Sequence, residues 1–275
     1  MRVASMGLPF LCMPERDDLM EYRLFVYGSL RRGEFNHGLL GASKCEALLA
    51  TLPGSLYDTG RGYPAMAEGE GGAAAQAGIV CGEIYRIDEE TLARVDDLED
   101  YYGPGDPRNL YERVKRTART DRGEADVLVY VSDRLRAGPE IAFGEWKLYR
   151  MMKKPALLYF DYGGCMDDER THTAGKAQWL GEVVGKGTVY GCQVRFIRHA
   201  SDEIRADMVE TGGATEGTLY RVPVEALEEV LYRREEARMD IYRPAVVPVT
   251  LGSGEIVDAL AFVAAGKQPE TANRK

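Results

Sequence analysis

The stretch "LFVYGSLRRGEFNH", residues 24–37, decides the fold, because part of it recurs later in the chain. Leu24 to Tyr27 are typical of a buried strand, and they run through Gly28-Ser29-Leu30 into a charged, helix-compatible segment. The pair Tyr27-Gly28 returns as Tyr162-Gly163 in "LLYFDYGGCM", about half the chain length further on. A repeat of this length predicts two copies of one domain rather than a solenoid.

A second pair of segments has the same spacing. "GEIYRID" at residues 82–88 resembles "GTLYRVP" at residues 217–223, and Tyr85 is as far from Tyr220 as Tyr27 is from Tyr162. An amphipathic helix is expected after each, in "EETLARVDDLE" and "VEALEEVLYRRE". We therefore expect two domains with flanking segments: an N-terminal extension at 1–20, domains at 21–150 and 155–267, and a polar tail at 268–275.

The order of elements within each copy indicates the fold class. Each contains a strand, the Tyr-Gly turn, a polar helical segment, several short strands and a helix between the later strands. Strands outnumber helices, and the two do not alternate as they would in a parallel α/β sheet. The predicted class is α+β, with a small sheet or barrel and flanking helices in each copy.

Composition restricts the function classes. The net charge of −9 argues against nucleic acid or an anionic membrane as a partner, since phosphate binding needs a basic face. The five cysteines form no C-x-x-C pair and the three histidines show no metal-ligand spacing, so we expect reduced thiols, a cytoplasmic location and no bound zinc or iron. No apolar run reaches the roughly 18 residues of a membrane span. Nothing in the sequence predicts an oligomeric state.

The helix expected after residue 88 carries a candidate catalytic group. Asp88 can cap this helix, and Leu92 and Val95 define an apolar face. Glu99 shares that face, where burial and the neighbouring Asp100 both favour the protonated carboxyl and raise its pKa. A carboxyl poised near neutrality suits general acid–base catalysis. The alternative is a solvated acidic helix end with Glu99 on its edge.

The second copy repeats this arrangement. Leu227 and Leu231 form its apolar stripe, and Glu235 lies on the same face, close to the repeat spacing from Glu99. Because both helices place a glutamate at the same position, the repeat favours a functional role over a solvated helix end.

The Tyr-Gly turn offers a second functional element. A strand that ends at Gly28 can expose successive backbone N–H groups, which bind a carboxylate or an oxyanion without a charged side chain. Ser29 can add a hydroxyl donor. The alternative is that Gly28 supplies only an awkward backbone angle.

Five motifs in order make the first copy recognisable. They are "VYGSLRRGEFNH", "YDTGRGYPAM" (57–66), "GEIYRID", "VDDLEDYYG" and "YERVKR". The set covers nearly all of residues 22–131 and resembles the γ-glutamylcyclotransferase superfamily, most closely its γ-glutamylamine cyclotransferase-like branch. Residues 156–265 resemble the same superfamily more distantly, and the whole is similar to its bacterial tandem-domain members.

The resemblance implies a fold, a reaction and a set of site residues. The fold would be two tandem copies of a small mixed β-barrel with flanking helices, and the reaction would need neither a metal nor an organic cofactor. In the family reaction the free α-amine of a γ-glutamyl group attacks its own side-chain carbonyl, releases an amine or amino acid and forms 5-oxoproline. The acid–base residue would be Glu99, and the substrate loop would be formed by Tyr27, Gly28, Ser29 and Leu30.

Other residues lie in family-like segments of the first copy. They are expected to shape the pocket, although strand aromatics are more often core. His37 is expected to have a structural role as a cap rather than a catalytic one. The expected pocket residues are Tyr57, Tyr63, Pro64, Tyr111 and Arg113.

The second copy departs from the family pattern. Its loop would consist of Tyr162, Gly163, Gly164 and Cys165, with Glu235 as acid–base residue. Gly164 stands where relatives carry serine, so the backbone donors remain while the hydroxyl is lost, and the activity of this copy stays open. Cys165 has no evident histidine partner and is not assigned as a nucleophile.

The leading hypothesis is a γ-glutamyl cyclotransferase acting on a small γ-glutamyl amine or γ-glutamyl amino acid, with an active first domain. The competing hypothesis is a non-catalytic module that binds a small carboxylated metabolite. In a third hypothesis the second domain only packs against the first. The sequence does not predict the leaving amine, because the loops that select it lie outside the motifs.

Overall fold

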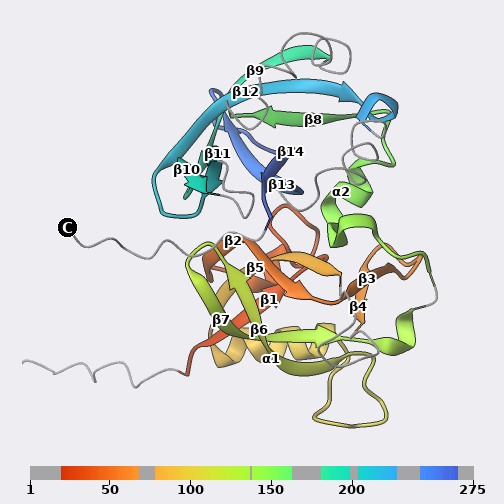
Figure 1. The fold of residues 1–275 in the computed structure, drawn as a ribbon. Coiled ribbons are helices and arrows are strands. Elements are labelled where there is room, and N and C mark those ends of the chain that lie inside the picture. Colours follow the sequence, from red (N-terminus) through yellow and green to blue (C-terminus); the bar gives the residue numbers. More distant parts are fainter. Residues whose placement is uncertain are drawn as a thin grey trace, which may run out of the picture.

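The chain folds into two five-stranded barrels, one above the other in Figure 1. The computed structural model describes residues 20–67, 78–136, 138–162, 181–198, 204–227 and 242–265. Within those ranges, no helix is long and apolar enough to cross a membrane.

The first barrel is closed by a parallel contact between its first and last strands. Its strands follow the order β1-β5-β2-β6-β7, and β7 returns to β1 with Leu128 opposite Leu24. The strands are β1 (Tyr22–Val26), β2 (Lys44–Pro53), β5 (Ile79–Ile87), β6 (Glu112–Thr120) and β7 (Gly123–Val131). The other elements of this half are η1 (His37–Leu40), β3 (Ser55–Asp58), β4 (Pro64–Ala67), α1 (Glu89–Leu98), η2 (Asp133–Leu135), η3 (Ala142–Gly144) and α2 (Trp146–Met151).

The second barrel has the order β12-β8-β14-β13-β9, and β14 is parallel to β8. A separate hairpin of β10 and β11 lies beside it in Figure 1. The elements are β8 (Ala156–Asp161), β9 (Glu182–Tyr190), β10 (Gln193–Arg198), β11 (Ile204–Val209), β12 (Ala214–Pro223), β13 (Tyr242–Leu251) and β14 (Ile256–Ala264).

Strand pairing reproduces the spacing of the sequence repeat. Leu24 of β1 lies opposite Tyr85 of β5, and one repeat further along the chain Tyr159 of β8 lies opposite Tyr220 of β12. The barrels share one strand order, with β8, β12, β9, β13 and β14 in the places of β1, β5, β2, β6 and β7. The predicted α+β fold, two tandem copies of a small barrel with flanking helices, is therefore confirmed. The numerical domain boundaries stay predictions.

The segment after the first Tyr-Gly turn differs from the helical segment expected there. Residues 29–36 form successive turns, and regular structure begins only with the short 3₁₀ helix η1. Gly33 has a φ of +79°, a left-handed conformation that interrupts a right-handed helix. The charges of this segment therefore mark a folded loop rather than an exposed helix face.

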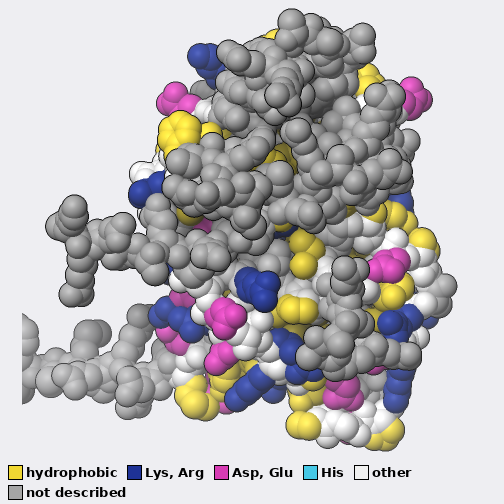
Figure 2. Space-filling view, viewed as in Figure 1, with side chains coloured by type: hydrophobic (Ala, Val, Ile, Leu, Met, Phe, Trp, Pro, Cys, Tyr) yellow, Lys and Arg dark blue, Asp and Glu magenta, His cyan; other side chains and the backbone are white. Residues whose placement is uncertain are grey.

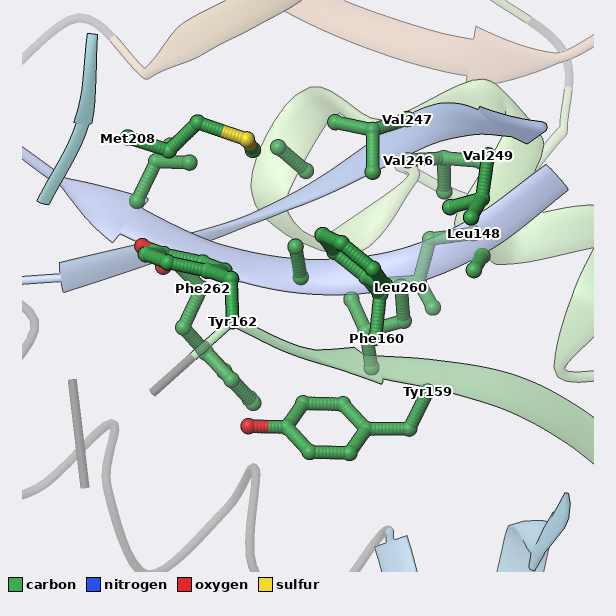
Figure 3. Packing of buried hydrophobic residues seen from close by; sticks show 14 of the residues in the cluster. Leu148, Tyr159, Phe160, Tyr162, Met208, Val246, Val247, Val249, Leu260 and Phe262 are labelled. Carbon is green, nitrogen blue, oxygen red and sulfur yellow. The ribbon is translucent and has the colours of Figure 1, made fainter. Parts of the chain in front are cut away.

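Each barrel encloses an apolar core, and the second core includes residues from the first half of the chain. Figure 3 shows Phe160, Leu260 and Phe262 inside the second barrel, with Leu148 of α2 in the same cluster. Leu49 of β2 belongs to this buried cluster as well. Burial of a leucine side chain contributes about 1.5–3 kcal/mol, so these contacts help to hold the two barrels together.

Polar contacts also join the barrels, at an irregularity in β2. The register of β2 against β5 shifts between residues 45 and 50, which frees backbone groups of Leu48 and Leu49 from the ladder. The Glu210 carboxylate accepts hydrogen bonds from both amides, the one from Leu49 at 3.2 Å. The buried Arg243 guanidinium donates to the Leu49 carbonyl at 2.7 Å.

Acidic and basic side chains are mixed on the described surface of the first barrel (Figure 2). Glu46, for example, pairs with both Arg23 and Arg86. Because exposed ion pairs contribute about 0–1 kcal/mol each, apolar burial and the buried contacts matter more for the fold.

Candidate active site

A cavity of about 340 Å³ opens beside the turn that follows β1. Its wall combines this turn with the start of β4, the end of α1 and the residues before β6. The predicted acid–base residue and the whole predicted substrate loop line it, together with Tyr111: Tyr27, Gly28, Ser29, Leu30, Glu99 and Tyr111. The other lining residues are Phe25, Val26, Phe35, Asn36, Tyr63, Pro64, Leu98, Asp100, Leu110 and Tyr130.

Helix α1 positions Glu99 through its cap and its apolar face. The Asp88 carboxylate accepts a hydrogen bond from the Thr91 amide at 2.8 Å, which confirms the predicted cap. Leu92 and Val95 are buried, so the predicted apolar face is also correct. Glu99 follows on the same face as the residue that ends the helix.

The helix ends in a Schellman motif that fixes the direction of Glu99. The Asp100 amide donates to the Asp97 carbonyl at 3.4 Å, and the Tyr101 amide donates to the Asp96 carbonyl at 3.0 Å. Asp100 has a φ of +48°, in the left-handed region that glycine usually occupies at this position. A non-glycine residue in this conformation is strained, and such strain often accompanies a functional site.

A polar network behind the cavity anchors the end of α1 to the barrel. The Asp96 carboxylate accepts hydrogen bonds from the Tyr130 hydroxyl at 2.6 Å and from the Arg113 guanidinium at 2.5 Å. The Arg113 side chain also covers the Tyr101 ring, 4.8 Å from its centroid. Arg113 therefore supports the pocket from outside rather than lining it as expected.

The Glu99 side chain is half-buried and faces the cavity. Among the residues that the structure describes, none forms a hydrogen bond or ion pair with its carboxyl. Burial, with a smaller effect of the Asp100 charge, raises the pKa of Glu99 to about 8. The carboxyl is therefore a half-buried group with a raised pKa rather than part of a solvated helix end.

The turn after β1 lines the cavity and contains two backbone donors. The Arg31 amide closes the turn on the Gly28 carbonyl at 3.0 Å. In the described part of the chain, the N–H groups of Ser29 and Leu30 find no acceptor. The Asn36 side-chain amide donates to the Ser29 hydroxyl oxygen at 3.0 Å, which leaves the hydroxyl proton free to donate.

Gly28 is needed for a close approach rather than for its backbone angle. It does not have a positive φ, so the expectation of an awkward angle is wrong. A Cβ atom at this position would lie 2.8 Å from Cδ and 2.9 Å from Cγ of Pro64. The start of β4 therefore packs directly on the turn, and it does so because residue 28 has no side chain.

The hydroxyl groups of two tyrosines of the predicted site form hydrogen bonds with backbone carbonyls of the barrel. The Tyr27 hydroxyl donates to the Tyr130 carbonyl at 2.8 Å, and the Met66 amide lies 3.3 Å from it. The Tyr111 hydroxyl donates to the Pro64 carbonyl at 3.1 Å. Burial raises the pKa of both phenols, so both stay neutral walls of the cavity.

Two other predicted residues lie elsewhere. Tyr57 does not line the cavity, and its ring is covered by Arg136 at 5.3 Å. His37 does not act as a cap, since its Nδ1 atom lies 3.0 Å from the Leu30 carbonyl oxygen. The His37 ring therefore stabilises the turn by its contact with the Leu30 carbonyl.

A buried ion cluster lies beneath the turn, and sequence reasoning did not predict it. Arg31 is 1% exposed and binds the carboxylates of Glu83 and Glu145, the first at 3.1 Å. Glu83 also accepts from the Arg32 amide at 3.0 Å and from the Tyr85 hydroxyl at 2.8 Å. Glu83 within the apolar run "IVCGEIYRI" is a signal that could have indicated a buried partner.

The second copy repeats one part of this site within the described residues. The Tyr162 hydroxyl donates to the Phe262 carbonyl at 2.6 Å, as the Tyr27 hydroxyl does to Tyr130. Leu227 is buried, as its predicted stripe requires. The remaining predicted residues of this copy lie outside the described residues: Gly163, Gly164, Cys165, Leu231 and Glu235.

No cluster of three or more acidic, histidine or cysteine side chains that could hold a metal occurs in the described ranges. In the cavity, one carboxyl of raised pKa shares a pocket with the turn whose Ser29 and Leu30 amides have no acceptor among the described residues, an arrangement that suits acid–base chemistry on a small molecule.

Comparison with known proteins gives the family of this barrel pair. The family described as γ-glutamyl cyclotransferase, AIG2-like, matches residues 24–148. YkqA of Bacillus subtilis, a protein named for γ-glutamylcyclotransferase, is 35% identical over 257 residues, which is 92% of this chain and 87% of YkqA. The chain belongs to the γ-glutamylcyclotransferase family.

Two further matches agree with this assignment. The crystal structure of Bacillus subtilis YkqA superposes with a TM-score of 0.73 at 35% identity, covering 91% of this chain and 86% of that one. The γ-L-glutamyl-butirosin B γ-glutamyl cyclotransferase of Niallia circulans is 41% identical over 128 residues, 46% of this chain and 77% of its own length.

Proposed function

We propose that the first barrel is a γ-glutamyl cyclotransferase, which converts a γ-glutamyl amine or γ-glutamyl amino acid to 5-oxoproline and a free amine. One observation carries the proposal. A single cavity is lined by Glu99, whose carboxyl has a pKa of about 8, and by Ser29 and Leu30, whose N–H groups lack acceptors among the described residues. Acid–base chemistry and stabilisation of negative charge are the two requirements of this reaction.

One carboxyl can perform the proton transfers. An α-amino group at a peptide N-terminus has a pKa of about 8, and the free α-carboxylate of a γ-glutamyl group raises this pKa. The Glu99 carboxylate, with a pKa of about 8, can take the α-ammonium proton at a smaller cost in free energy than an ordinary glutamate. The amine then attacks the side-chain carbonyl carbon, a C–N bond forms, and the carbonyl oxygen becomes anionic. Protonated Glu99 gives its proton to the leaving nitrogen as the original C–N bond breaks. The carboxylate then takes the second proton of the ring nitrogen and passes it to the released amine, which leaves as an ammonium ion beside a neutral lactam nitrogen.

The turn supplies donors for the negative charge. The N–H groups of Ser29 and Leu30 and the Ser29 hydroxyl can bind the developing oxyanion or the α-carboxylate of the substrate. Loss of one oxyanion donor typically lowers kcat on the order of a hundredfold. Ring closure is intramolecular, so a cavity of about 340 Å³ that holds the glutamyl chain folded supplies part of the acceleration.

The charge of the cavity favours one class of leaving group. Of the described residues that line it, the charged ones are the acids Glu99 and Asp100. A γ-glutamyl amine adds no further carboxylate to this surface, whereas a γ-glutamyl amino acid does. The relative from Niallia circulans is named for γ-L-glutamyl-butirosin B. We therefore expect γ-glutamyl amines to be the better substrates.

The second barrel is proposed to contribute structure more than turnover. Tyr162 repeats the hydroxyl contact of Tyr27, while Gly164 replaces the serine. Glu235 remains the candidate acid–base residue of that copy. A reducing cytoplasm is the proposed compartment, and Cys45 and Cys81 are free thiols among the described residues.

The test measures release of 5-oxoproline by the full chain from γ-glutamyl amines, γ-glutamyl amino acids and glutathione. Glu99→Gln keeps the shape of the side chain but cannot accept a proton, so turnover should fall roughly 10²- to 10⁴-fold with folding intact. Glu124→Gln is the matched control, because Glu124 is exposed on β7 and outside the cavity. It should retain wild-type turnover.

Three outcomes separate the hypotheses. Undiminished turnover in both Glu99→Gln and Glu235→Gln would contradict the proposal. Residual turnover that disappears only in the double variant would assign activity to the second barrel too. Thermal stabilisation by γ-glutamyl compounds without any 5-oxoproline would favour a binding module instead.

A further inference from the structure

The turn after β1 and the residues that follow it are hydrogen-bonded to two different parts of the protein. We call residues 28–33 the substrate turn. Glu83 of the first barrel accepts the Arg32 amide at 3.0 Å, and Lys147 of α2 donates to the Arg32 carbonyl at 2.6 Å. The backbone N–H and the backbone carbonyl of Arg32 are thus both bound to charged side chains. Such bonds are roughly twice as strong as neutral ones.

Lys147 is itself held by the second barrel. Its side chain is 3% exposed, and its ammonium group lies 2.7 Å from a carboxylate oxygen of Asp258 on β14. A buried ammonium group needs such a partner to remain charged. Asp258 therefore acts on the Arg32 carbonyl through Lys147.

The packing at Gly33 shows how close the second barrel comes to the substrate turn. A Cβ atom on Gly33 would lie 3.6 Å from Oδ2 of Asp258 and 3.9 Å from Nζ of Lys147. The left-handed backbone of Gly33 turns the chain at this contact. The end of the substrate turn thus lies directly against the ion pair.

Arg31 connects the same place to the start of α2. Its guanidinium binds Glu83 and Glu145, and Glu145 also caps α2 by accepting from the Lys147 amide at 3.2 Å. The turn, α2 and β14 therefore share one hydrogen-bonded network of charged side chains, which is buried except at Asp258. Displacement of Lys147 would move the backbone that carries the Ser29 and Leu30 amides.

We infer that Lys147 and Asp258 are positioning residues, through which the second barrel holds the substrate turn of the first in its binding geometry. The inference rests on the proposed function for its effect on turnover, but not for its effect on the turn itself. The second barrel would then be a required part of the first site, whatever the activity of its own copy.

The first experiment compares kinetics of full-length variants. Asp258→Ala and Lys147→Met should each lower kcat/KM about tenfold, as expected for loss of a charge-assisted hydrogen bond. The double variant should have the same kcat/KM as Lys147→Met, because Asp258 acts on the Arg32 carbonyl only through Lys147. Lys147→Gln keeps a donor for the Arg32 carbonyl and should recover part of the loss.

A matched control removes a different contact between the barrels. The Asp121 carboxylate accepts from the Glu210 amide at 2.8 Å, a contact between the barrels in which no residue of the substrate turn takes part. Asp121→Ala therefore makes the same substitution at another interface contact and should leave kcat/KM unchanged. If Asp258→Ala does not fold, Asp258→Asn keeps the size of the side chain and removes only its charge.

The second experiment is independent of turnover. Hydrogen exchange of the Arg31, Arg32 and Glu34 amides, which are all hydrogen-bonded, should become about tenfold faster in Asp258→Ala and stay as in wild type in Asp121→Ala. If the wild-type protein forms no 5-oxoproline, the proposed function fails, but hydrogen exchange still tests whether Lys147 and Asp258 hold the substrate turn. Unchanged exchange in Asp258→Ala and Lys147→Met, or equal acceleration in Asp121→Ala, would overturn the inference.

Discussion

Asp100 follows Glu99 at the end of α1 and places a second carboxylate beside it, in a left-handed conformation with a φ of +48°. Burial raises the pKa of Glu99 to about 8, and the charge of Asp100 adds to that effect. The helix end thus combines backbone strain with repulsion between like charges. The strain lies in the Asp100 backbone, and the repulsion acts on Glu99, whose proton transfer the proposed reaction needs.

Replacement of Asp100 by asparagine should shift the pH profile of kcat/KM. Asparagine tolerates the left-handed conformation, so the helix end keeps its shape while the repulsion disappears. The pKa of Glu99 should fall, and the rising limb of the profile should move to lower pH by about half to one unit. The matched control is Asp97→Asn, an exposed acid on the last turn of the same helix. Equal shifts in both variants would show that general surface charge, rather than Asp100, sets the pKa.

Glu99 should also make the protein less stable as the pH rises. Its pKa is about 8 in the folded state and about 4.3 in an unfolded chain, so between these values the folded state binds more protons. The free energy of unfolding therefore falls from pH 4.3 to pH 8 and the loss is complete above that range. Glu99→Gln removes this dependence and should be more stable than wild type by about 2–4 kcal/mol at pH 9.

Urea unfolding at pH 5 and pH 9 measures this effect. The difference between Glu99→Gln and wild type should be small at pH 5 and large at pH 9. Glu124→Gln, at an exposed position, should show no such growth. A stability difference that does not change with pH would mean that the Glu99 carboxyl is not buried in solution.

The fold could be predicted largely because its signals are periodic. The spacing that separates Tyr85 from Tyr220 in the sequence reappears in the pairing of β1 with β5 and of β8 with β12. A strand that buries one face has a fixed register, so equal spacing in sequence becomes equal spacing in the barrel. Glu99 could be placed for a similar reason, since helical periodicity sets its face relative to Leu92 and Val95.

The features that sequence reasoning missed depend on distant partners. Arg31 is buried because Glu83 and Glu145 meet it, 52 and 114 residues further along the chain. No local sequence pattern predicts which distant charged side chains will form ion pairs. Gly28 is similar, because a glycine required by a close neighbour looks the same in sequence as one required by its backbone angle. Pro64 becomes its neighbour only in the folded barrel.

Gly28→Ala should destabilise the protein through a specific collision. The added Cβ would lie 2.8 Å from Cδ of Pro64, and a proline ring has little freedom to move away. We expect a loss of about 1–3 kcal/mol in the free energy of unfolding, measured by urea titration. Pro64→Ala removes Cγ and Cδ, so the double variant should recover part of this loss. Gly38→Ala is the control, since a Cβ at Gly38 meets no atom within 4 Å.

A double variant without recovery would show that the collision with Pro64 is not the cause. Disruption of the turn's own hydrogen bond would then be the expected cause, because the Gly28 carbonyl accepts the bond from the Arg31 amide that closes the turn.

Ser29 and Asn36 should act on turnover as one unit. The Asn36 amide donates to the Ser29 hydroxyl oxygen at 3.0 Å, so the hydroxyl proton is left to donate to a ligand in the cavity that both residues line. Ser29→Ala and Asn36→Ala should each lower kcat about fivefold to tenfold, less than loss of a main oxyanion donor, because the hydroxyl only supplements the two backbone N–H groups with one neutral hydrogen bond. The double variant should lose no more than the larger single loss, because each change disables the same donor. His37→Ala, which removes a contact to the Leu30 carbonyl instead, is the comparison. In the double variant of His37 and Ser29, the fold losses in kcat of the two single variants should multiply. If the losses of Ser29→Ala and Asn36→Ala also multiply in their double variant, Asn36 does not orient the hydroxyl.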